Sequence, residues 1–387
     1  MNNKVYLINC PSYDQVEDKI NELFQMMGGI EQFAAPDESI ALKVNLLMAA
    51  EPEKAITTHP RLAAAVGNLT KAQGAKAFIL DSPTGAYQYN ERTMKRVYRA
   101  CGMSRAAQEA GIALNFDTTH QPVSFPEGKL IQHFDILTPL VKADGIFNLC
   151  KLKTHTLMTM TGAVKNIFGA IPGRKKPGFH ATLQDPALFA QMLLDLVDCV
   201  SPRLSIMDAV VGMEGNGPSN GHLRHIGLLL ASENPLALDV VAGEIIGLEP
   251  EHNPILEEAK KRGTYPHRLE HIDLIGADPA ELRIPGFSLP ATLAPRTSWI
   301  LQTFSPLFKD GLSLKPLIVK DICIACGDCR EICPMQAITI QEDENDRGKK
   351  YAVINDNECI RCYCCHETCP QDAIDLQKSL LYRILNV

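Results

Sequence analysis

The 387-residue chain has no uninterrupted apolar run of eighteen residues, and its first residues, MNNKVYLINCPSYD, contain no basic stretch leading into an apolar one. The first absence argues against a membrane-spanning helix, and the second argues against a secretory signal peptide. Basic residues are not in excess either, since 38 Lys and Arg stand against 45 Asp and Glu, for a net charge of -7. This balance does not indicate nucleic-acid binding. We expect a soluble cytoplasmic protein with no membrane span.

Acidic residues are missing from one long internal window, which has no Asp or Glu between Gly145 and Gln184. The basic residues of this window are Lys151, Lys153, Lys165, Arg174, Lys175 and Lys176, accompanied by His155 and His180. Lysine is usually exposed, so a solvated basic loop is the ordinary explanation. A site for an anionic ligand is the alternative, because these residues share one sign of charge.

Cysteine is abundant, and eight of the 13 cysteines form a pattern that occurs twice. Each copy is spaced Cys-x2-Cys-x2-Cys-x3-Cys-Pro, first at Cys323, Cys326, Cys329 and Cys333, then at Cys359, Cys362, Cys365 and Cys369. This is the bacterial iron–sulfur run, in which the fourth cysteine ligates the other cluster. We expect two 4Fe-4S clusters that fold the domain on binding. Cluster one would use Cys323, Cys326, Cys329 and Cys369, and cluster two Cys359, Cys362, Cys365 and Cys333.

Other uses of these cysteines fit the spacing poorly. A zinc site closes with four ligands at wider separations between its pairs, and disulfide frameworks belong to small secreted domains. Cys364 lies outside the template and is expected to be a small hydrophobic residue. Cys10, Cys101, Cys150 and Cys199 share no ligand spacing, so we interpret them as buried, reduced thiols, as in a cytosolic protein.

Short aliphatic runs alternate with helical segments over the first 284 residues, and this predicts an α/β fold with a mostly parallel sheet and helices on both faces. Strands are expected at 5–9, 39–44, 76–81, 145–149, 203–209, 225–231 and 271–276, and helices at 59–74, 91–111, 185–200 and 234–247. We expect residues 1–284 to form this body. The proline-rich segment 285–316 would dock on it, and residues 317–387 would form a small α+β ferredoxin-like domain whose last residues, SLLYRILNV, pack against the protein.

Polar residues follow several predicted strands. GIFNL leads directly into Lys151, Lys153 and His155, and ligands of open α/β sheets lie at the carboxyl ends of strands. The two lysines would project to the same side only if the strand continues that far. TGAVKNIFGAIPG places Lys165 and Asn166 among glycines that can cradle an anion, although it is not a Walker motif.

A second glycine-rich stretch, DAVVGMEGNGPSNG, carries Glu214, Gly215, Asn216 and Gly217. It could supply a proton or bind a cation, and an ordinary turn is an equally good interpretation. Smaller polar features occur at Lys43 and Asn45, at 58–60 and at 81–83, where caps and turns are the usual explanation.

Together, KVN (43–45), TTHP (57–60), DSP (81–83), KLKTH (151–155), TGAVKNIFGAIPG (161–173) and GMEGNGP (212–218) resemble the domain-of-unknown-function family 362. The resemblance covers most of residues 38–246, and a likeness to two-cluster ferredoxins covers 318–372. The family pattern often has proline where this chain has Val44 and Cys150. The resemblance implies an iron–sulfur protein, but the family's reaction is not generally established.

We hypothesise a ferredoxin-fed reductase, an oxidoreductase best handled anaerobically, that passes electrons from a redox partner protein to an anionic substrate. Catalysis would involve Lys153, His155, Lys165 and Glu214, and the ligand or cofactor would be held by Lys43, Asn45, Asn166, Gly215, Asn216 and Gly217. A rival hypothesis is a binding module that only presents its clusters to a partner enzyme, and a third is a scaffold that delivers a cluster or metal.

Overall fold

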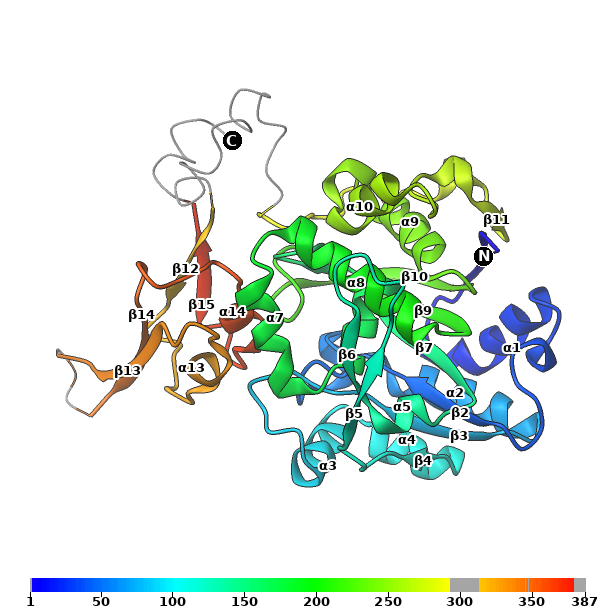
Figure 1. The fold of residues 1–387 in the computed structure, drawn as a ribbon, viewed down its shortest axis with the longest axis horizontal. Helices are drawn as coiled ribbons and strands as arrows, with labels where there is room; N and C mark the ends of the chain where they lie inside the picture. The colour runs from blue at the N-terminus through cyan, green and yellow to red at the C-terminus, as the bar shows by residue number, and fades with distance from the viewer. Residues whose placement is uncertain (1, 293–312, 345, 347, 379–387) are drawn as a thin grey trace.

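The computed structural model describes residues 2–292, 313–344, 346 and 348–378. A large α/β body is followed by a small C-terminal domain that lies beside it (Figure 1). The expectations for most of the proline-rich segment, and for the last nine residues, fall outside the described residues. Residues 285–292 are described and pack on the body: Phe287 and Leu289 contact its core, and the Thr292 hydroxyl donates to the Thr156 carbonyl at 2.6 Å.

Nine strands form the central sheet of the body, in the order β11-β1-β10-β9-β7-β2-β3-β4, with β8 paired to β7. They are β1 (Lys4–Asn9), β2 (Ser39–Lys43), β3 (Lys76–Leu80), β4 (Ala113–Leu114), β7 (Gly145–His155), β8 (Thr159–Thr161), β9 (Leu204–Glu214), β10 (His222–Ser232) and β11 (Asp273–Ile275). β2 is parallel to β3 and β7, and β7 is parallel to β9, whereas β10 is antiparallel to β1 and β9. The predicted, mostly parallel sheet is confirmed.

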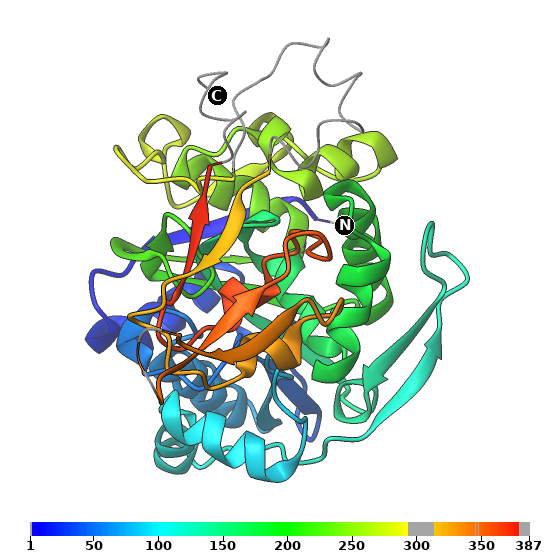
Figure 2. The same ribbon diagram turned by 90° about the vertical axis from the view of Figure 1, so that its left-hand side faces the viewer.

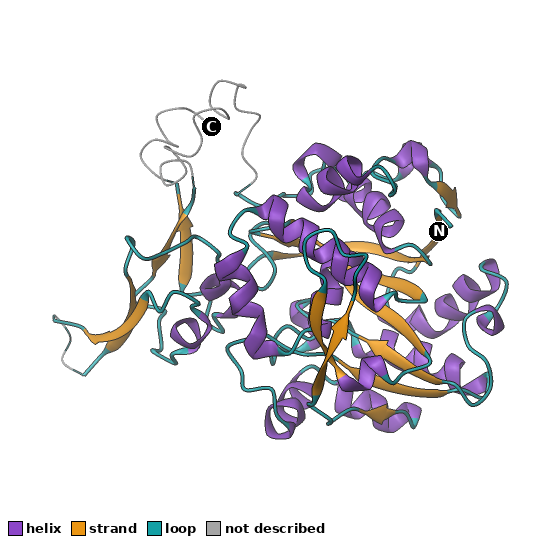
Figure 3. Ribbon diagram, viewed as in Figure 1, coloured by secondary structure: helices purple, strands orange, loops and turns teal. Residues whose placement is uncertain are grey.

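Helices cover both faces of this sheet, as Figure 3 shows. They are α1 (Val16–Met26), α2 (Pro60–Ala72), α3 (Glu91–Ala100), α4 (Met103–Ala110), α5 (Thr138–Val141), α6 (Ala163–Asn166), α7 (Lys176–Thr182), α8 (Pro186–Val200), α9 (Pro235–Ile246) and α10 (Pro254–Arg262). Alternate residues of β2 serve the two faces: Ile40 and Leu42 join the core under α1 and α2, and Ala41 joins the core under α8. A hairpin of β5 (His120–Ser124) and β6 (His133–Leu137) stands apart from the sheet.

Several elements differ from their predicted bounds: the strand expected at 203–209, for example, continues to Glu214. The single helix expected over 91–111 is two helices, because Gly102 adopts a φ of +74° and ends the first helical run. The strand expected at 145–149 continues to His155, so β7 has eleven residues, all of them buried. This continuation brings Lys151, Lys153 and His155 into the sheet, and they do not form a solvated basic loop.

The C-terminal domain consists of two similar halves. β12 (Lys315–Ile318) pairs antiparallel with β15 (Ile374–Gln377), and β13 (Ile338–Glu342) pairs antiparallel with β14 (Lys350–Ile354). Two short helices, α13 (Asp328–Ile332) and α14 (Cys364–Thr368), contact each other between these hairpins. Figure 2 shows the domain in front of the body, above the cyan helices α3 and α4. No helix among the described residues is both long and apolar enough to cross a membrane.

Candidate functional site

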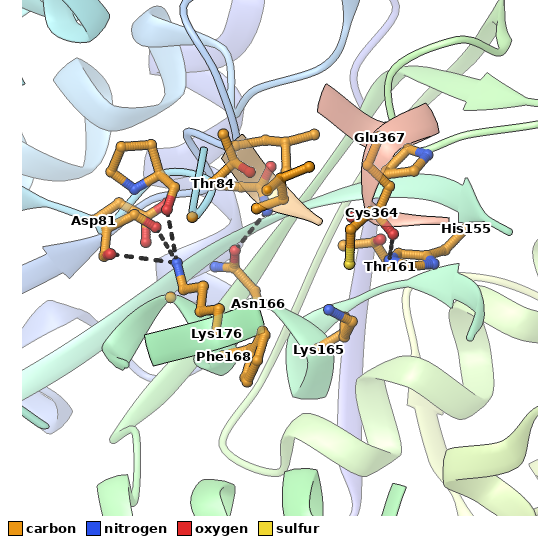
Figure 4. A pocket seen from close by; sticks show the side chains of 18 of the residues that line it. Asp81, Thr84, His155, Thr161, Lys165, Asn166, Phe168, Lys176, Cys364 and Glu367 are labelled. Carbon is orange, nitrogen blue, oxygen red and sulfur yellow. Dashed lines mark hydrogen bonds and ion pairs between the residues drawn. The ribbon is translucent and has the colours of Figure 1, made fainter. Parts of the chain in front are cut away.

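A pocket opens where the carboxyl ends of β2, β3 and β7 meet, which is where ligands bind in open α/β sheets (Figure 4). Counted together with the solvent at its mouth, it encloses about 660 Å³. The body contributes Asn45, Asp81, Ser82, Thr84, Lys153, His155, Thr161, Lys165, Asn166, Phe168, Lys176, His180 and Pro218.

The C-terminal domain forms one wall of this pocket through Ile332, Cys364 and Glu367. Three hydrogen bonds between the two domains hold α14 in place. The Ser219 hydroxyl donates to the Glu367 carbonyl at 2.8 Å, the Asn220 side chain donates to the His366 carbonyl at 2.9 Å, and the hydroxyls of Thr84 and Thr368 lie 3.2 Å apart. The loop between β9 and β10 therefore docks the C-terminal domain against the body.

Two of the buried lysines near the pocket are neutralised by buried acids. Lys43 Nζ lies 2.7 Å from Asp81 Oδ1, and Lys151 Nζ lies 2.9 Å from Asp208 Oδ2. All four side chains are at most 4% exposed, so each ion pair compensates charges that could not otherwise be buried. Lys43 and Lys151 thus stabilise the strand ends and are not available to a ligand.

The three lysines that line the pocket lack such partners. Lys153 Nζ donates to Asn45 Oδ1 at 3.1 Å and to the Ile56 carbonyl at 2.5 Å, and Lys176 Nζ donates to the Ser82 hydroxyl at 3.3 Å and to the Ser82 and Pro83 carbonyls. These acceptors are neutral, and burial lowers the pKa of Lys153 and of Lys176 to about 7. An anion in the pocket would favour the charged form of both.

Lys165 is the least satisfied of the three. Its ammonium lies over the rings of Phe168 and Phe189, 4.6 and 5.3 Å from their centroids, and it has no hydrogen bond to any residue that the structure describes. Burial lowers its pKa. Two further polar atoms of the pocket, Thr161 Oγ1 and His180 Nδ1, are also buried without a hydrogen-bond partner in the described part of the chain. Buried polar groups left without partners mark a place where a polar ligand can bind.

His155 links the lysines to the C-terminal domain. Its Nδ1 accepts the backbone N–H groups of Leu157 at 3.1 Å and Met158 at 3.3 Å. The proton of the neutral ring must therefore be on Nε2, which lies 3.1 Å from Glu367 Oε1. Burial lowers the pKa of His155, so the ring is neutral, and burial raises the pKa of Glu367 to about 7.

The loop that carries Lys165 is held by an acid on another helix. Asp239, in α9, accepts the N–H groups of Ala163 at 2.6 Å and Val164 at 3.1 Å. A Cβ at Gly162 would lie 2.1 Å from Asp239 Oδ1, and one at Gly169 would lie 2.1 Å from Asp81 Oδ1. We expected these glycines to let the backbone bind an anionic ligand. Instead, they allow the backbone to approach two buried carboxylates of the protein itself.

The eight template cysteines surround two cavities in the C-terminal domain. One cavity is lined by Cys323, Cys326, Cys329 and Cys369, and the other by Cys333, Cys359, Cys362 and Cys365. Each set combines three cysteines of one motif with the fourth of the other. In the described ranges, no three His, Cys, Asp or Glu side chains converge as they would on a single metal ion. Four thiols around a cavity fit a cubane, so these residues could hold iron–sulfur clusters in the crosswise pattern.

The pocket collects only part of the predicted site. Lys153, His155, Lys165, Asn45 and Asn166 line it, and Asn45 and Asn166 are joined by a 2.9 Å hydrogen bond. Lys43 lies behind it, paired with Asp81.

Glu214, Gly215, Asn216 and Gly217 of the second glycine-rich stretch do not line the pocket, although the neighbouring Pro218 does. Glu214 accepts the Ser288 N–H at 3.0 Å, Gly215 donates to the Ser288 carbonyl at 2.7 Å, and Asn216 accepts the Ala291 N–H at 2.9 Å. Gly217 packs against β7, where a Cβ would lie 2.3 Å from the Thr154 carbonyl oxygen. This stretch is structural in the described chain, since it fastens residues 285–292 to the body.

Some pocket residues were not predicted. Glu367 and Cys364 lie within the cysteine motif, and nothing local in the sequence indicates that they face the body. Asp239 had a visible signal, because it is the one acid among the first eight residues of the helix PLALDVVAGEII. A buried acid in such an apolar helix needs a partner, and here the partners are backbone N–H groups.

Comparison with known proteins identifies the two parts of the chain. The model for the domain of unknown function DUF362 matches residues 40–244, and that for a 4Fe-4S dicluster domain matches residues 322–373. The chain is also 32% identical over 316 residues to the thylakoid-associated protein sll1697 of Synechocystis sp., covering 79% of this chain and 93% of that protein. This chain belongs to the DUF362 family and carries an iron–sulfur cluster-binding domain, which indicates iron–sulfur electron transfer.

Solved structures resemble the body more distantly. The lactate racemase apoprotein of Thermoanaerobacterium thermosaccharolyticum is 12% identical with a TM-score of 0.42, and the likeness covers 63% of this chain and 57% of that one. A structural-genomics protein of Thermotoga maritima is also 12% identical, with a TM-score of 0.33, and covers 53% of this chain and 52% of that one.

Proposed function

We propose that this protein is a ferredoxin-fed reductase that binds two 4Fe-4S clusters and reduces a small anionic molecule in the pocket between its two domains. One observation carries the proposal: the pocket wall that bears the unsatisfied lysines faces a wall made by α14, and Cys364 of α14 lines both the pocket and the cavity of cluster two. When bound, the clusters would supply single electrons at low or moderate potential.

In this proposal the lysines bind and orient the ligand. Among the residues that the structure describes, Lys165 has no hydrogen-bonded acceptor for its three N–H donors, and Lys153 has one donor left after its contacts with Asn45 and Ile56. Both would attract a carboxylate or phosphate group and would stabilise negative charge that builds up on it during reduction. Thr161 and His180 supply two further polar atoms that a ligand could satisfy.

Glu367, whose pKa burial raises to about 7, is the proposed proton donor, and His155 is proposed to donate a hydrogen bond to the ligand through its neutral ring. The Nε2–H direction of His155 is fixed, because Nδ1 is occupied by two backbone donors, and the ring lines the pocket. Each electron adds one negative charge to the substrate, and a proton must be supplied for every such charge that the product does not keep. Glu214, a predicted proton donor, is engaged with Ser288 away from the pocket and has no role in this proposal.

The partner and compartment are proposals of the same kind. Iron–sulfur clusters store and pass on electrons but do not generate them, so we propose that a partner protein supplies the electrons. All 13 cysteines are free thiols in the structure, which supports a reducing compartment such as the cytoplasm.

The test is anaerobic reoxidation. Protein with reduced clusters is mixed with a panel of carboxylate and phosphate metabolites, and recovery of the iron–sulfur absorbance is followed without any other protein. At least one anion should reoxidise the clusters, and Lys165→Met and Lys153→Met should abolish this while leaving the cluster spectrum unchanged. Lys175→Met is the matched control, since Lys175 borders the pocket-lining Lys176 but lies 2.6 Å from Asp135 outside it.

Two outcomes would contradict the proposal. Reoxidation that requires a partner protein for every anion would favour the rival, a module that only presents its clusters. Equal activity in wild type, Lys165→Met and Lys153→Met would show that electrons leave the clusters without using the pocket.

A further inference from the structure

The two cysteine-lined cavities have different surroundings. The cavity lined by Cys333, Cys359, Cys362 and Cys365 also contacts Cys364, which faces the pocket. The cavity lined by Cys323, Cys326, Cys329 and Cys369 contacts Ile324, whose side chain is 59% exposed. Cys326 itself is exposed. Cluster two would therefore be the inner cluster and cluster one the outer cluster.

The exposed side of the outer cavity also carries apolar side chains. Ile322 and Ile324 flank the ligand Cys323 and are 46% and 59% exposed. Large apolar residues are exposed singly on most proteins, but two that flank a ligand cysteine form a small contact surface around it. We refer to residues 322–326 as the outer-cluster loop.

A basic helix face lies close to this loop. In α3, Arg92, Arg96 and Arg99 are all exposed, and their spacing of four and three residues places them on one side of the helix. None of the three forms an ion pair or a hydrogen bond with another residue in the described parts of the chain. Lys95 lies on the same helix but is neutralised by Glu91 at 2.6 Å.

Three observations connect this helix face with the C-terminal domain. Ala86, just before α3, packs against the core of that domain. The Arg96 guanidinium lies 4.5 Å from the centre of the Tyr87 ring. Asp328 of α13 is near enough to Arg96 for their charges to interact.

We propose that the arginine face of α3 and the outer-cluster loop together form the docking surface for an acidic electron-carrier protein. Three exposed arginines in a protein of net charge -7 would attract and orient a partner with an acidic face, and Ile322 and Ile324 would supply apolar contact beside the exposed Cys326. One electron would pass from the reduced carrier to the outer cluster at each encounter, so the carrier is oxidised by one electron and no bond is made or broken.

The position of the arginines favours a redox protein over an anionic membrane surface. A lipid surface would need basic residues only, whereas these arginines lie on the helix that follows Ala86, which packs against the domain of the predicted cluster ligands. The proposal depends on cluster binding by the cysteines and does not require the pocket to be catalytic.

The experiment measures electron entry alone. Oxidised, cluster-loaded protein is mixed anaerobically with reduced flavodoxin as an acidic carrier, and bleaching of the iron–sulfur absorbance is followed by stopped flow at low salt. Arg92→Glu/Arg99→Glu should slow this phase at least about 10-fold, because electrostatic steering changes association rates by about 10- to 1,000-fold. The difference should shrink as salt is added. Arg92→Gln/Arg99→Gln should give an intermediate rate.

Control experiments distinguish a loss of partner docking from damage to the protein or its clusters. Lys260→Glu/Lys261→Glu makes the same charge change on the exposed face of α10, away from the C-terminal domain, and should leave the rate unchanged. Reduction by the cationic dye methyl viologen should not be slowed in any variant. Equal slowing in the α10 variant, or no slowing in the α3 variants, would overturn the proposal. It would also be overturned if the α3 variants lost binding only to phosphatidylglycerol vesicles, because the surface would then serve a lipid membrane.

Discussion

Lys43 is buried and Lys165 is partly buried beside the same pocket, and the structure predicts opposite consequences when each is replaced by methionine. Methionine retains most of the volume of the lysine chain and removes its charge. Lys43 is paired at 2.7 Å with Asp81, which is 4% exposed on its side chain. Lys165 has no acidic partner within hydrogen-bonding distance among the described residues, and contacts two aromatic rings.

Stability should separate the two variants. Lys43→Met leaves the buried Asp81 carboxylate without its counterion, and breaking a buried pair in this way costs about 3–5 kcal/mol of unfolding free energy. Lys165→Met loses two cation–π contacts worth about 0.5–2 kcal/mol each, but it also removes the cost of burying an ammonium, so the net change should be within about 1 kcal/mol.

Lys165→Met should have little effect on stability but should weaken the binding of the anionic ligand. A hydrogen bond to a charged group contributes about 1.5–3 kcal/mol, which corresponds to about 10- to 150-fold in affinity. Urea unfolding followed by circular dichroism gives the stabilities, and the half-saturating concentration of the reoxidising anion gives the affinities. If Lys165→Met were as destabilising as Lys43→Met, or bound the anion as tightly as wild type, Lys165 would be a structural lysine and the argument would fail.

Two further predictions concern the charge of the pocket and the pairing of the motifs. Burial lowers the pKa of Lys153 to about 7, so the affinity for an anion should weaken as the pH rises through about 7. The ligand-free protein should become more stable between pH 7 and pH 10.5, because the folded protein then no longer buries the lysine charge. An anion affinity that does not change with pH would contradict this. Cys369→Ser should lower iron to about half and disturb the cluster bound by the first motif, whereas Cys364→Ala should retain full iron; loss of the second motif's cluster instead would exclude crosswise pairing.

Much of the fold could be predicted from local sequence. The apolar runs of the parallel strands are long enough to signal burial on both faces, and Asp185 and Asn234 mark the starts of α8 and α9, where each side chain accepts an N–H group of the first turn. The break between α3 and α4 was missed because Ala and Met continue the helical pattern on both sides of Gly102, and a single glycine is often tolerated inside a helix.

The pocket could be predicted only in part, for a physical reason. Lys153, His155 and Lys165 were found because an acid-free window followed a strand. The distinction between Lys43 and Lys165 depends on Asp81, which lies 84 residues before Lys165 in sequence and forms an ion pair with Lys43. Partners that meet only in the folded chain leave no local pattern, and the wall contributed by Glu367 required knowledge of how the two domains dock.

The docking of α14 has a consequence for how the protein matures. Because α14 lies between Cys362 and Cys369, its position depends on cysteines expected to bind inorganic iron and sulfide, yet it also closes the lysine-lined pocket. A newly made chain awaiting its metal would have an incomplete ligand site, and a bound ligand would in turn favour the loaded form through mutual linkage. The protein would therefore bind its ligand only after the clusters have been inserted, and a chain without clusters would not hold the ligand unproductively.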